Sequence, residues 1–425
     1  MMAKTVELHE IVRIEGHMNF TVVVHDGDVK ARAEALEGTR LLERLLIGRR
    51  FSEIPDIASR MCGVCQAIHR VTAVQALEAA FGIELPEDLE ALRKLVVIGG
   101  HIQSHILHLH LFVLPDFLGH DSVMDLAASH GDLVRLVFRV KKLANMLTEI
   151  IGGRAVHPVT PIVGGFSRLP SRQELERVAR LAREIEGLSV DIVEPLLSLD
   201  MPEFSREKTY IALYNRSGLP LLRGYIASSS GIVFSPEDYD SNLRYVTESY
   251  SMARHYLFND REYMVGALSR LNINYGALSD TAKELAKKYD LEFPSNSPFD
   301  NNKAQALEIV HFAEEARRLS EDLLETGVSQ RTVAFRIRKG DGVAATEAPR
   351  GLLIHHYKLN DKGRVEVANM ITPTAQNYKS METDAEAYVK KLLDEGVEDL
   401  ELEIEKLIRA YDPCVSCSAR FFREH

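Results

Sequence analysis

Cysteine is scarce in this 425-residue chain, and tryptophan is absent altogether. There are only four cysteines, and they form two pairs near the two ends of the chain, Cys62-Gly-Val-Cys65 and Cys414-Val-Ser-Cys417. So few cysteines argue against the disulfide framework of a small secreted domain. The lack of tryptophan excludes nothing. Two CxxC pairs in an otherwise cysteine-free chain are typical of a metal or redox site.

An excess of basic residues, a long apolar run and an apolar leader are also missing. The formal net charge is −11, which argues against a surface for nucleic acid or anionic membranes, because both need clustered lysine and arginine. No segment approaches ~18 apolar residues without a charge, so we expect no membrane span. Residues 1–7 do not form an apolar signal stretch, so we expect a cytoplasmic protein.

The hydrophobic pattern predicts a mainly α-helical (α+β) fold, in which a large helical bundle carries small antiparallel β additions. The capping box Ser171-Arg-Gln-Glu174 marks the start of one helix. Further helices are expected over 89–114, 126–151, 237–257, 278–289 and 302–325. With 45% apolar residues and no linker or repeat, we expect a single unit over 1–425: β-rich at 1–35, mainly helical at 36–330, β-rich at 331–375, and a C-terminal helix with the second CxxC pair at 376–425.

The cysteine pairs suggest thiolate ligands, which are soft and suit Zn, Fe, Ni or Cu(I). A structural Cys₄ zinc or iron site is the simplest alternative. Zinc ribbons, however, place their pairs ~15–20 residues apart, whereas Cys65 and Cys414 are 349 positions apart. A structural zinc site can form from cysteines that are close in sequence, so it does not require ligands from the two ends of the chain.

Five sequence blocks together resemble one known family over nearly the full chain. They are Arg13-Ile-Glu-Gly-His17, Arg60 through His69, Gly152 through Pro158, Glu347-Ala-Pro-Arg-Gly351 and Asp412 through Arg420. The chain is similar to the large, catalytic subunit of nickel–iron hydrogenases. The segment Arg350 through Tyr357 looks most like the soluble cytosolic class coupled to NAD(P) or coenzyme F420. The resemblance implies reversible heterolytic cleavage of H2 to protons and electrons, and the nickel–iron hydrogenase large-subunit fold.

The resemblance also assigns the cysteines. Cys62 and Cys414 would be terminal ligands of nickel, while Cys65 and Cys417 would bridge nickel and iron. The iron would carry additional carbonyl and cyanide ligands. Splitting H2 heterolytically needs a Lewis acid and a nearby base, and the Cys414 thiolate can be that base.

Several neighbours of the metals follow from the same motifs. Arg350 would donate to a cyanide, with Pro349 and Thr374 beside the diatomic ligands. Glu15 is the expected first proton relay; outside its Arg-Ile-Glu-Gly-His frame, a lone glutamate is usually a solvated surface residue. His69 would donate to a bridging sulfur, although a lone histidine is more often a hydrogen-bonded core residue.

A magnesium site is the one implied feature that the sequence puts in question. Glu43 matches the carboxylate that binds Mg²⁺ in the family, and a backbone carbonyl near Met370 would be a further ligand. The histidine that usually follows the last cysteine is Arg420 here, and an arginine cannot ligate a cation. Either the magnesium site is absent and Arg420 pairs with Glu43, or another group takes the place of the histidine ligand. We expect a changed site.

A second departure from the family lies on the helix that holds Ser104, where many relatives carry an aspartate. Serine keeps a hydrogen-bonding group but removes the charge. The same helix holds His101, His105, His108 and His110. His101 and His105 share a face, but no acidic ligand is expected to join them, so packed core histidines are favoured over a second metal site.

Electrons must leave such a site, and an iron–sulfur cluster normally takes four cysteines. Since none remain, a separate small subunit with 4Fe–4S clusters is implied, with flavin and NAD(P) subunits beyond it. The family also implies a nickel chaperone and a maturation endopeptidase, for which Phe421 through His425 would be a cleavable tail or a natural end. The alternative function is a non-catalytic Cys₄ metal scaffold related to the quinone-site subunits of respiratory complex I.

Overall fold

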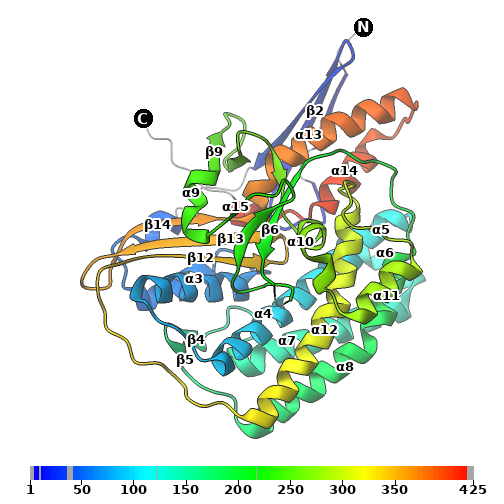
Figure 1. The fold of residues 1–425 in the computed structure, drawn as a ribbon. Coiled ribbons are helices and arrows are strands. Elements are labelled where there is room, and N and C mark those ends of the chain that lie inside the picture. The colour runs from blue at the N-terminus through cyan, green and yellow to red at the C-terminus, as the bar shows by residue number, and fades with distance from the viewer. Residues whose placement is uncertain (1–3, 9–10, 36–41, 121, 217, 419–425) are drawn as a thin grey trace.

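The computed structural model describes residues 4–8, 11–35, 42–120, 122–216 and 218–418 (Figure 1). Five helices form the body, and the small sheets lie beside it. This is the mainly helical architecture with antiparallel additions that the hydrophobic pattern predicts. The body helices are α3 (Gln66–Phe81), α4 (Glu87–Leu107), α7 (Gly131–Gly152), α8 (Arg172–Leu197) and α12 (Asp300–Thr326).

Helix α4 lies at the centre of this body, packed against α3, α7 and α12. It continues through a π-helical turn, η2 (His108–Val113), into α5 (Leu114–Phe117). The whole stretch Glu87–Phe117 is long and apolar enough to cross a membrane by length and composition, contrary to the expectation from counting charges. Within the protein, 89% of its most apolar window is buried. Burial on all sides accounts for its apolar composition without a membrane.

The β12–β13–β14 sheet covers α3 (Figure 1). Its antiparallel strands are β12 (Gly340–Ala348), β13 (Gly351–Leu359) and β14 (Val365–Ile371). Glycine allows the close approach at Gly342, because an added Cβ there would overlap the backbone of Ala76 and Ala80 on α3. This contact fixes the distance between the sheet and the helix that follows the first cysteine pair.

Replacing Gly342 with alanine is expected to lower the free energy of unfolding by ~1–3 kcal/mol, because the overlap involves backbone atoms that cannot rotate away. The matched control is Gly187→Ala on the exposed side of α8, where an added Cβ meets no atom within 4 Å. That change should be neutral or stabilising by up to about 1 kcal/mol, since alanine favours helix. Urea unfolding of both variants tests this. Equal midpoints would contradict the proposed close contact.

The N-terminal sheet brings the start of the chain to its end. Strands β1 (Lys4–Leu8), β2 (Met18–His25) and β3 (Asp28–Ala35) form an antiparallel meander. Strand β3 lies along α13 (Pro373–Asp394), and both project from the body in Figure 1. Between β1 and β2, the backbone of Glu15 pairs with that of Cys414.

The expected helix over 237–257 is wrong. This segment contains only a short helical turn, followed by strands β9 (Leu243–Thr247) and β10 (Arg254–Phe258). Both strands are rich in aromatic and β-branched side chains, which favour a pleated surface. The region 36–330 thus carries more strand than its mainly helical pattern suggested.

Other boundaries follow local signals. Ser171 and Glu174 form the reciprocal capping box at the start of α8, and Gly153, in the left-handed conformation, ends α7. The remaining helices are α1 (Leu42–Leu46), α2 (Ile54–Ser59), α6 (Val123–Ser129), α9 (Tyr239–Asn242), α10 (Ala267–Asn274), α11 (Asp280–Lys288), α14 (Leu400–Ala410) and α15 (Val415–Ser418), with 3₁₀ turns η1 (Phe51–Glu53), η3 (Pro236–Asp238) and η4 (Tyr275–Ala277). The remaining strands are β4 (Pro161–Ile162), β5 (Gly165–Phe166), β6 (Thr209–Tyr214), β7 (Tyr225–Ser228), β8 (Val233–Phe234) and β11 (Tyr263–Met264).

Candidate metal centre

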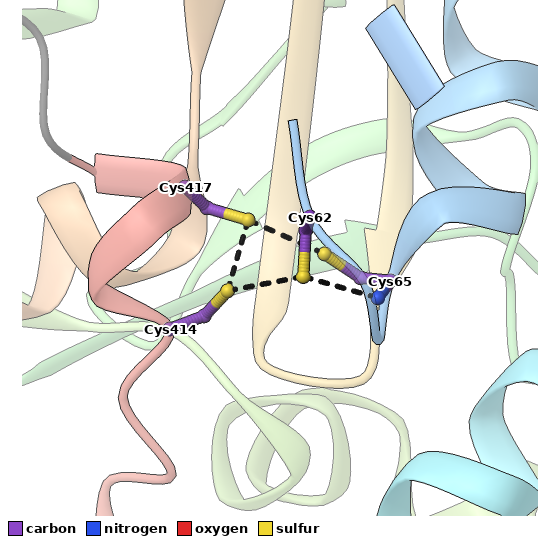
Figure 2. Close-up of side chains that lie close together, drawn as sticks. All are labelled: Cys62, Cys65, Cys414 and Cys417. Carbon is purple, nitrogen blue, oxygen red and sulfur yellow. Dashed lines mark hydrogen bonds between the residues drawn. The ribbon is translucent and has the colours of Figure 1, made fainter. Parts of the chain in front are cut away.

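The four cysteines meet at one point between the two chain ends (Figure 2). Cys62 lies in the turn before α3 and Cys65 is the N-cap residue of that helix. Cys414 directly precedes the short helix α15, and Cys417 lies within it. Each CxxC pair therefore sits where a loop turns into a helix, so that both of its sulfurs face the opposite pair.

The sulfur atoms lie close enough to share metal ions. The Sγ atoms of Cys62 and Cys414 are 3.3 Å apart, those of Cys65 and Cys417 are 3.4 Å apart, and those of Cys414 and Cys417 are 2.9 Å apart. The four side chains are 1–4% exposed. Four buried sulfurs at these separations match the soft donor set of a transition-metal site.

The thiols differ in how readily they lose a proton. Hydrogen bonding by Cys414, and then by the other two thiols, holds the pKa of Cys62 well below its usual value. Burial raises the pKa of Cys414 and of Cys417 well above the usual value. Without metal, the cluster therefore keeps protons that a bound cation would displace.

Glu15 reaches the cluster from the opposite chain end. Its Oε2 atom accepts a hydrogen bond from Cys414 Sγ at 3.0 Å and from the Ser416 N–H at 3.2 Å, and its Oε1 accepts from the Ser416 hydroxyl. Burial raises its pKa, and the neighbouring Cys62 raises it further. A carboxyl group with a raised pKa beside a thiol is suited to proton transfer.

Arg350 is buried near the sulfurs between two other polar groups. Its Nε donates to the Asp412 carbonyl at 2.9 Å, its Nη2 lies 2.9 Å from Asp412 Oδ1, and its Nη1 lies 3.5 Å from Ser104 Oγ. Burial opposes its charge, but Asp412 and the cysteines outweigh that effect and raise its pKa well above the usual value. The ion pair leaves a buried Nη2 without a well-aligned hydrogen bond, so a donor remains available at the site.

The structure also places the other two residues expected beside the metals. Thr374 Oγ1 accepts a hydrogen bond from the Cys414 N–H at 2.8 Å, so Thr374 fixes the backbone of the second cysteine pair. The Pro349 carbonyl accepts from Arg270 Nη2 at 3.0 Å. Arg270 thereby holds the turn between β12 and β13 that carries Pro349 and Arg350.

His69 lies one helical turn beyond Cys65 on α3. Its Nε2 is 3.7 Å from Cys417 Sγ, and its Nδ1 is 3.1 Å from the Nε2 of His355. The imidazole is 1% exposed. His69 follows the first cysteine pair in sequence, but the sulfur that it contacts is that of Cys417 in the second pair.

Glu43 and Met370 are neighbours, as the resemblance requires. Glu43 Oε1 accepts a hydrogen bond from the Met370 N–H at 2.8 Å, and Oε2 lies 3.9 Å from Arg254 Nη1. A backbone donor and a guanidinium therefore face this carboxylate. Arg420 and Phe421 through His425 lie outside the described residues.

The histidines on α4 and η2 are hydrogen-bonded core residues, but the expectation that no acidic group joins His101 and His105 is wrong. Glu308 on α12 lies with them, and its Oε2 is 2.9 Å from His105 Nε2. Arg270 also binds both oxygens of Glu308, at 2.6 and 2.7 Å. A carboxylate already paired with a guanidinium is a poor ligand, so this cluster is a buried ion network. His108 bonds to the Gln305 side chain and to a backbone carbonyl, and His110 bonds to two backbone carbonyls.

Three polar partners at the site were not singled out from the sequence. Ser416 bonds to Glu15, Asp412 pairs with Arg350, and Arg270 holds the Pro349 carbonyl. Ser416 and Asp412 lie within the second cysteine block, so their position was a usable signal. Arg270 has no such signal, because its partners are distant in sequence.

Several known proteins that are similar to this chain in sequence or fold are named as hydrogenases. The family model described as nickel-dependent hydrogenase matches residues 40–132 and 224–420. The alpha chain of sulfhydrogenase 2 from Pyrococcus furiosus is 34% identical over 98% of this chain and 99% of that protein. A component of the F420-non-reducing hydrogenase vhu from Methanocaldococcus jannaschii is 30% identical over 88% of this chain and 96% of that protein. The crystal structure of an NAD+-reducing NiFe-hydrogenase in the H2-reduced state superposes with a TM-score of 0.89 at 28% identity, covering 98% of this chain and 99% of that one.

The chain therefore belongs to the nickel-dependent hydrogenase family. It is an oxidoreductase that acts on hydrogen, and its four clustered cysteines fit the catalytic nickel–iron subunit. The alternative of a non-catalytic Cys₄ scaffold is not favoured, because the ligand cysteines are all present and converge on one site.

Proposed function

We propose that Cys62 and Cys414 would hold nickel as terminal ligands and that Cys65 and Cys417 would be the ligands shared by nickel and iron. The observation that carries the proposal is the convergence of four buried sulfurs from two distant CxxC pairs, with separations of 2.9–3.4 Å along one path through the cluster. The donor set is all thiolate, which suits these metals. When bound, the centre supplies the Lewis acid at which H2 is cleaved heterolytically.

The sulfur of Cys414 takes the proton that is released from H2 and passes it to the Glu15 carboxylate. Glu15 Oε2 is 3.0 Å from this sulfur, within the distance over which a positioned base accepts a proton. Ser416 holds the carboxylate with both its N–H and its hydroxyl. Burial raises the pKa of Glu15, so this carboxyl group holds a proton more readily than an ordinary glutamate, which suits a proton relay.

Arg350 would hold a diatomic ligand of the iron, and Pro349 and Thr374 would lie beside that ligand. The support is the buried Nη2 of Arg350, which has a poorly aligned contact with Asp412 and can donate to a cyanide nitrogen. Asp412 balances the charge of the guanidinium and holds it in place. Ser104 adds an uncharged polar contact where a carboxylate would compete for Arg350.

The electrons pass to an iron–sulfur small subunit in the cytoplasm, and from there through flavin-bearing subunits to NAD(P). All four cysteines of this chain lie in the metal cluster, so a relay needs another polypeptide. One similar structure is named an NAD+-reducing hydrogenase, and one similar protein is named F420-non-reducing. These names favour NAD(P) over coenzyme F420. A nickel chaperone and a maturation endopeptidase would complete the assembly.

Arg254 replaces Mg²⁺ as the counterion of Glu43 in this proposal. Magnesium needs oxygen ligands in a near-octahedral arrangement, but Glu43 faces the Met370 N–H and the Arg254 guanidinium. Arg254 is itself held over the ring of Tyr245, 4.3 Å from its centre. Among the residues that the structure describes, these two donors do not fit the ion.

Metal analysis with infrared spectroscopy tests the proposed centre on the purified complex. The expected result is one nickel and one iron per chain, with carbonyl and cyanide bands and no magnesium held at Glu43. Zinc without nickel would overturn the nickel–iron assignment and support a scaffold. Magnesium that is lost in a Glu43→Gln variant would overturn only the role given to Arg254.

A further inference from the structure

A chain of three hydrogen bonds leads away from the cluster at Cys417, whereas Glu15 contacts Cys414. It runs from Cys417 Sγ to His69 Nε2 (3.7 Å), from His69 Nδ1 to His355 Nε2 (3.1 Å), and from His355 Nδ1 to the Tyr357 hydroxyl (2.8 Å). The three side chains beyond the sulfur are 0–1% exposed. None of the three is a ligand of the proposed metals, and the last two have no part in the proposed reaction.

The fold explains why these groups are aligned. Side chains two residues apart in a strand point to the same face, so His355 and Tyr357 of β13 both face α3, which carries His69. His356 points the other way and bonds to Tyr239 and Asp341. The glycine at position 342, which pairs with Tyr357 in the sheet, lets the two layers approach closely.

The hydrogen bond between His69 and the Cys417 sulfur determines which atom donates in each of the other two hydrogen bonds. A thiolate that bridges two metals carries no proton, so it can only accept, and His69 Nε2 must donate to it. In a neutral imidazole one nitrogen donates and the other accepts. His69 Nδ1 therefore accepts from His355 Nε2–H. His355 Nδ1 in turn accepts from the Tyr357 hydroxyl.

We propose that His355 and Tyr357 are positioning residues that hold His69 in the tautomer that donates a hydrogen bond to the bridging sulfur of Cys417. This inference rests on the proposed nickel–iron centre. Partners that fix the tautomer and orientation of a histidine near a metal tune that metal. Hydrogen bonds to cluster sulfurs likewise alter their electron density. Tyr357 therefore influences the iron through two imidazoles without touching it.

The test is infrared spectroscopy of the Tyr357→Phe holoenzyme. Phenylalanine keeps the ring and removes the hydroxyl that donates to His355 Nδ1, so the tautomer of His355 is less firmly held and donation to the sulfur weakens. A sulfur with more electron density passes more to the iron, which shifts the carbonyl and cyanide bands to lower wavenumber. Nickel and iron contents should remain those of the wild type.

The matched control is Tyr239→Phe. It breaks a tyrosine–histidine hydrogen bond of the same length, 2.8 Å, to His356 on the opposite face of β13, and should leave the bands in place. If Tyr357→Phe does not fold, His355→Leu should shift the bands and His355→Gln, which retains an N–H donor, should shift them less. Bands at wild-type positions in Tyr357→Phe, or in both His355 variants, would overturn the inference.

The two proposals fail in different ways. If the wild-type complex has no carbonyl and cyanide bands, the nickel–iron function itself is wrong. If those bands are present and Tyr357→Phe leaves them unchanged, only the role of His355 and Tyr357 is wrong.

Discussion

Replacing Cys414 with serine is expected to abolish hydrogen uptake. The substitution exchanges a soft thiolate for a hard hydroxyl that is not ionised at neutral pH, so the ligand is lost. It also removes the sulfur that accepts the proton from H2 and that lies 3.0 Å from Glu15 Oε2. Loss of a positioned proton acceptor alone costs about 10²–10⁴ in rate, and loss of metal adds to this. Hydrogen uptake with a soluble dye as electron acceptor, together with nickel analysis, measures both effects.

The fold should survive this change, because Cys414 is one small side chain in a cluster that forms without a disulfide. Circular dichroism checks that point. Ser189→Ala is the control: the hydroxyl of this buried serine on α8 donates to the Glu186 carbonyl of the same helix, and its loss should leave hydrogen uptake unchanged. Wild-type activity in Cys414→Ser would refute its assignment as ligand and proton acceptor.

The residues that form the cluster were predictable because their signal is local. Each CxxC pair is a short motif that ends at a helix, and Glu15 and His69 lie in equally short blocks. The resemblance brought these blocks together, and the structure places them in contact. Their pairing could not follow from spacing alone, since 349 positions separate Cys65 from Cys414.

Long-range polar contacts were not predictable for the opposite reason. The pairing of Glu308 with Arg270 and His105 joins three separate helices, and nothing local marks a buried glutamate before the helices pack. The strands at 243–258 were missed because a helical pattern was assigned to a segment whose aromatic and β-branched residues favour a sheet. Arg254 faces Glu43 from this segment, so the same error concealed the cation beside the expected magnesium site.

Arg270 is the centre of a buried ion network beside the turn that carries Arg350. It binds both oxygens of Glu308, one oxygen of Glu347 and the carbonyls of Ala348 and Pro349. The two carboxylate partners are fully buried, and the two carbonyls lie where β12 ends. Burial alone would raise the pKa of Glu308, but Arg270 holds it at about 2, whereas burial raises that of Glu347 to about 7.

Replacing Arg270 with methionine is therefore expected to lower the free energy of unfolding by about 3–5 kcal/mol at pH 7, because it leaves buried carboxyl groups without their cation. In the wild type, the depressed pKa of Glu308 contributes stability above its unfolded value of about 4.5, and this contribution is lost as the pH falls toward 2. In the variant, the folded state binds protons more readily than the unfolded state. The deficit should therefore shrink between pH 7 and pH 5.

Urea unfolding at the two pH values measures this difference, and Arg318→Met is the matched control. Arg318 pairs with Asp322 at 3.3 Å on the same helix as Glu308, but both side chains are 58% exposed. Exposed pairs contribute about 0–1 kcal/mol, so its loss should be small at both pH values. A deficit for Arg270→Met no larger than that of the control, or one that grows as the pH falls to 5, would contradict the view that buried carboxylates without a cation destabilise the variant. Contacts other than those of Arg270 would then hold the turn that carries Arg350 in place.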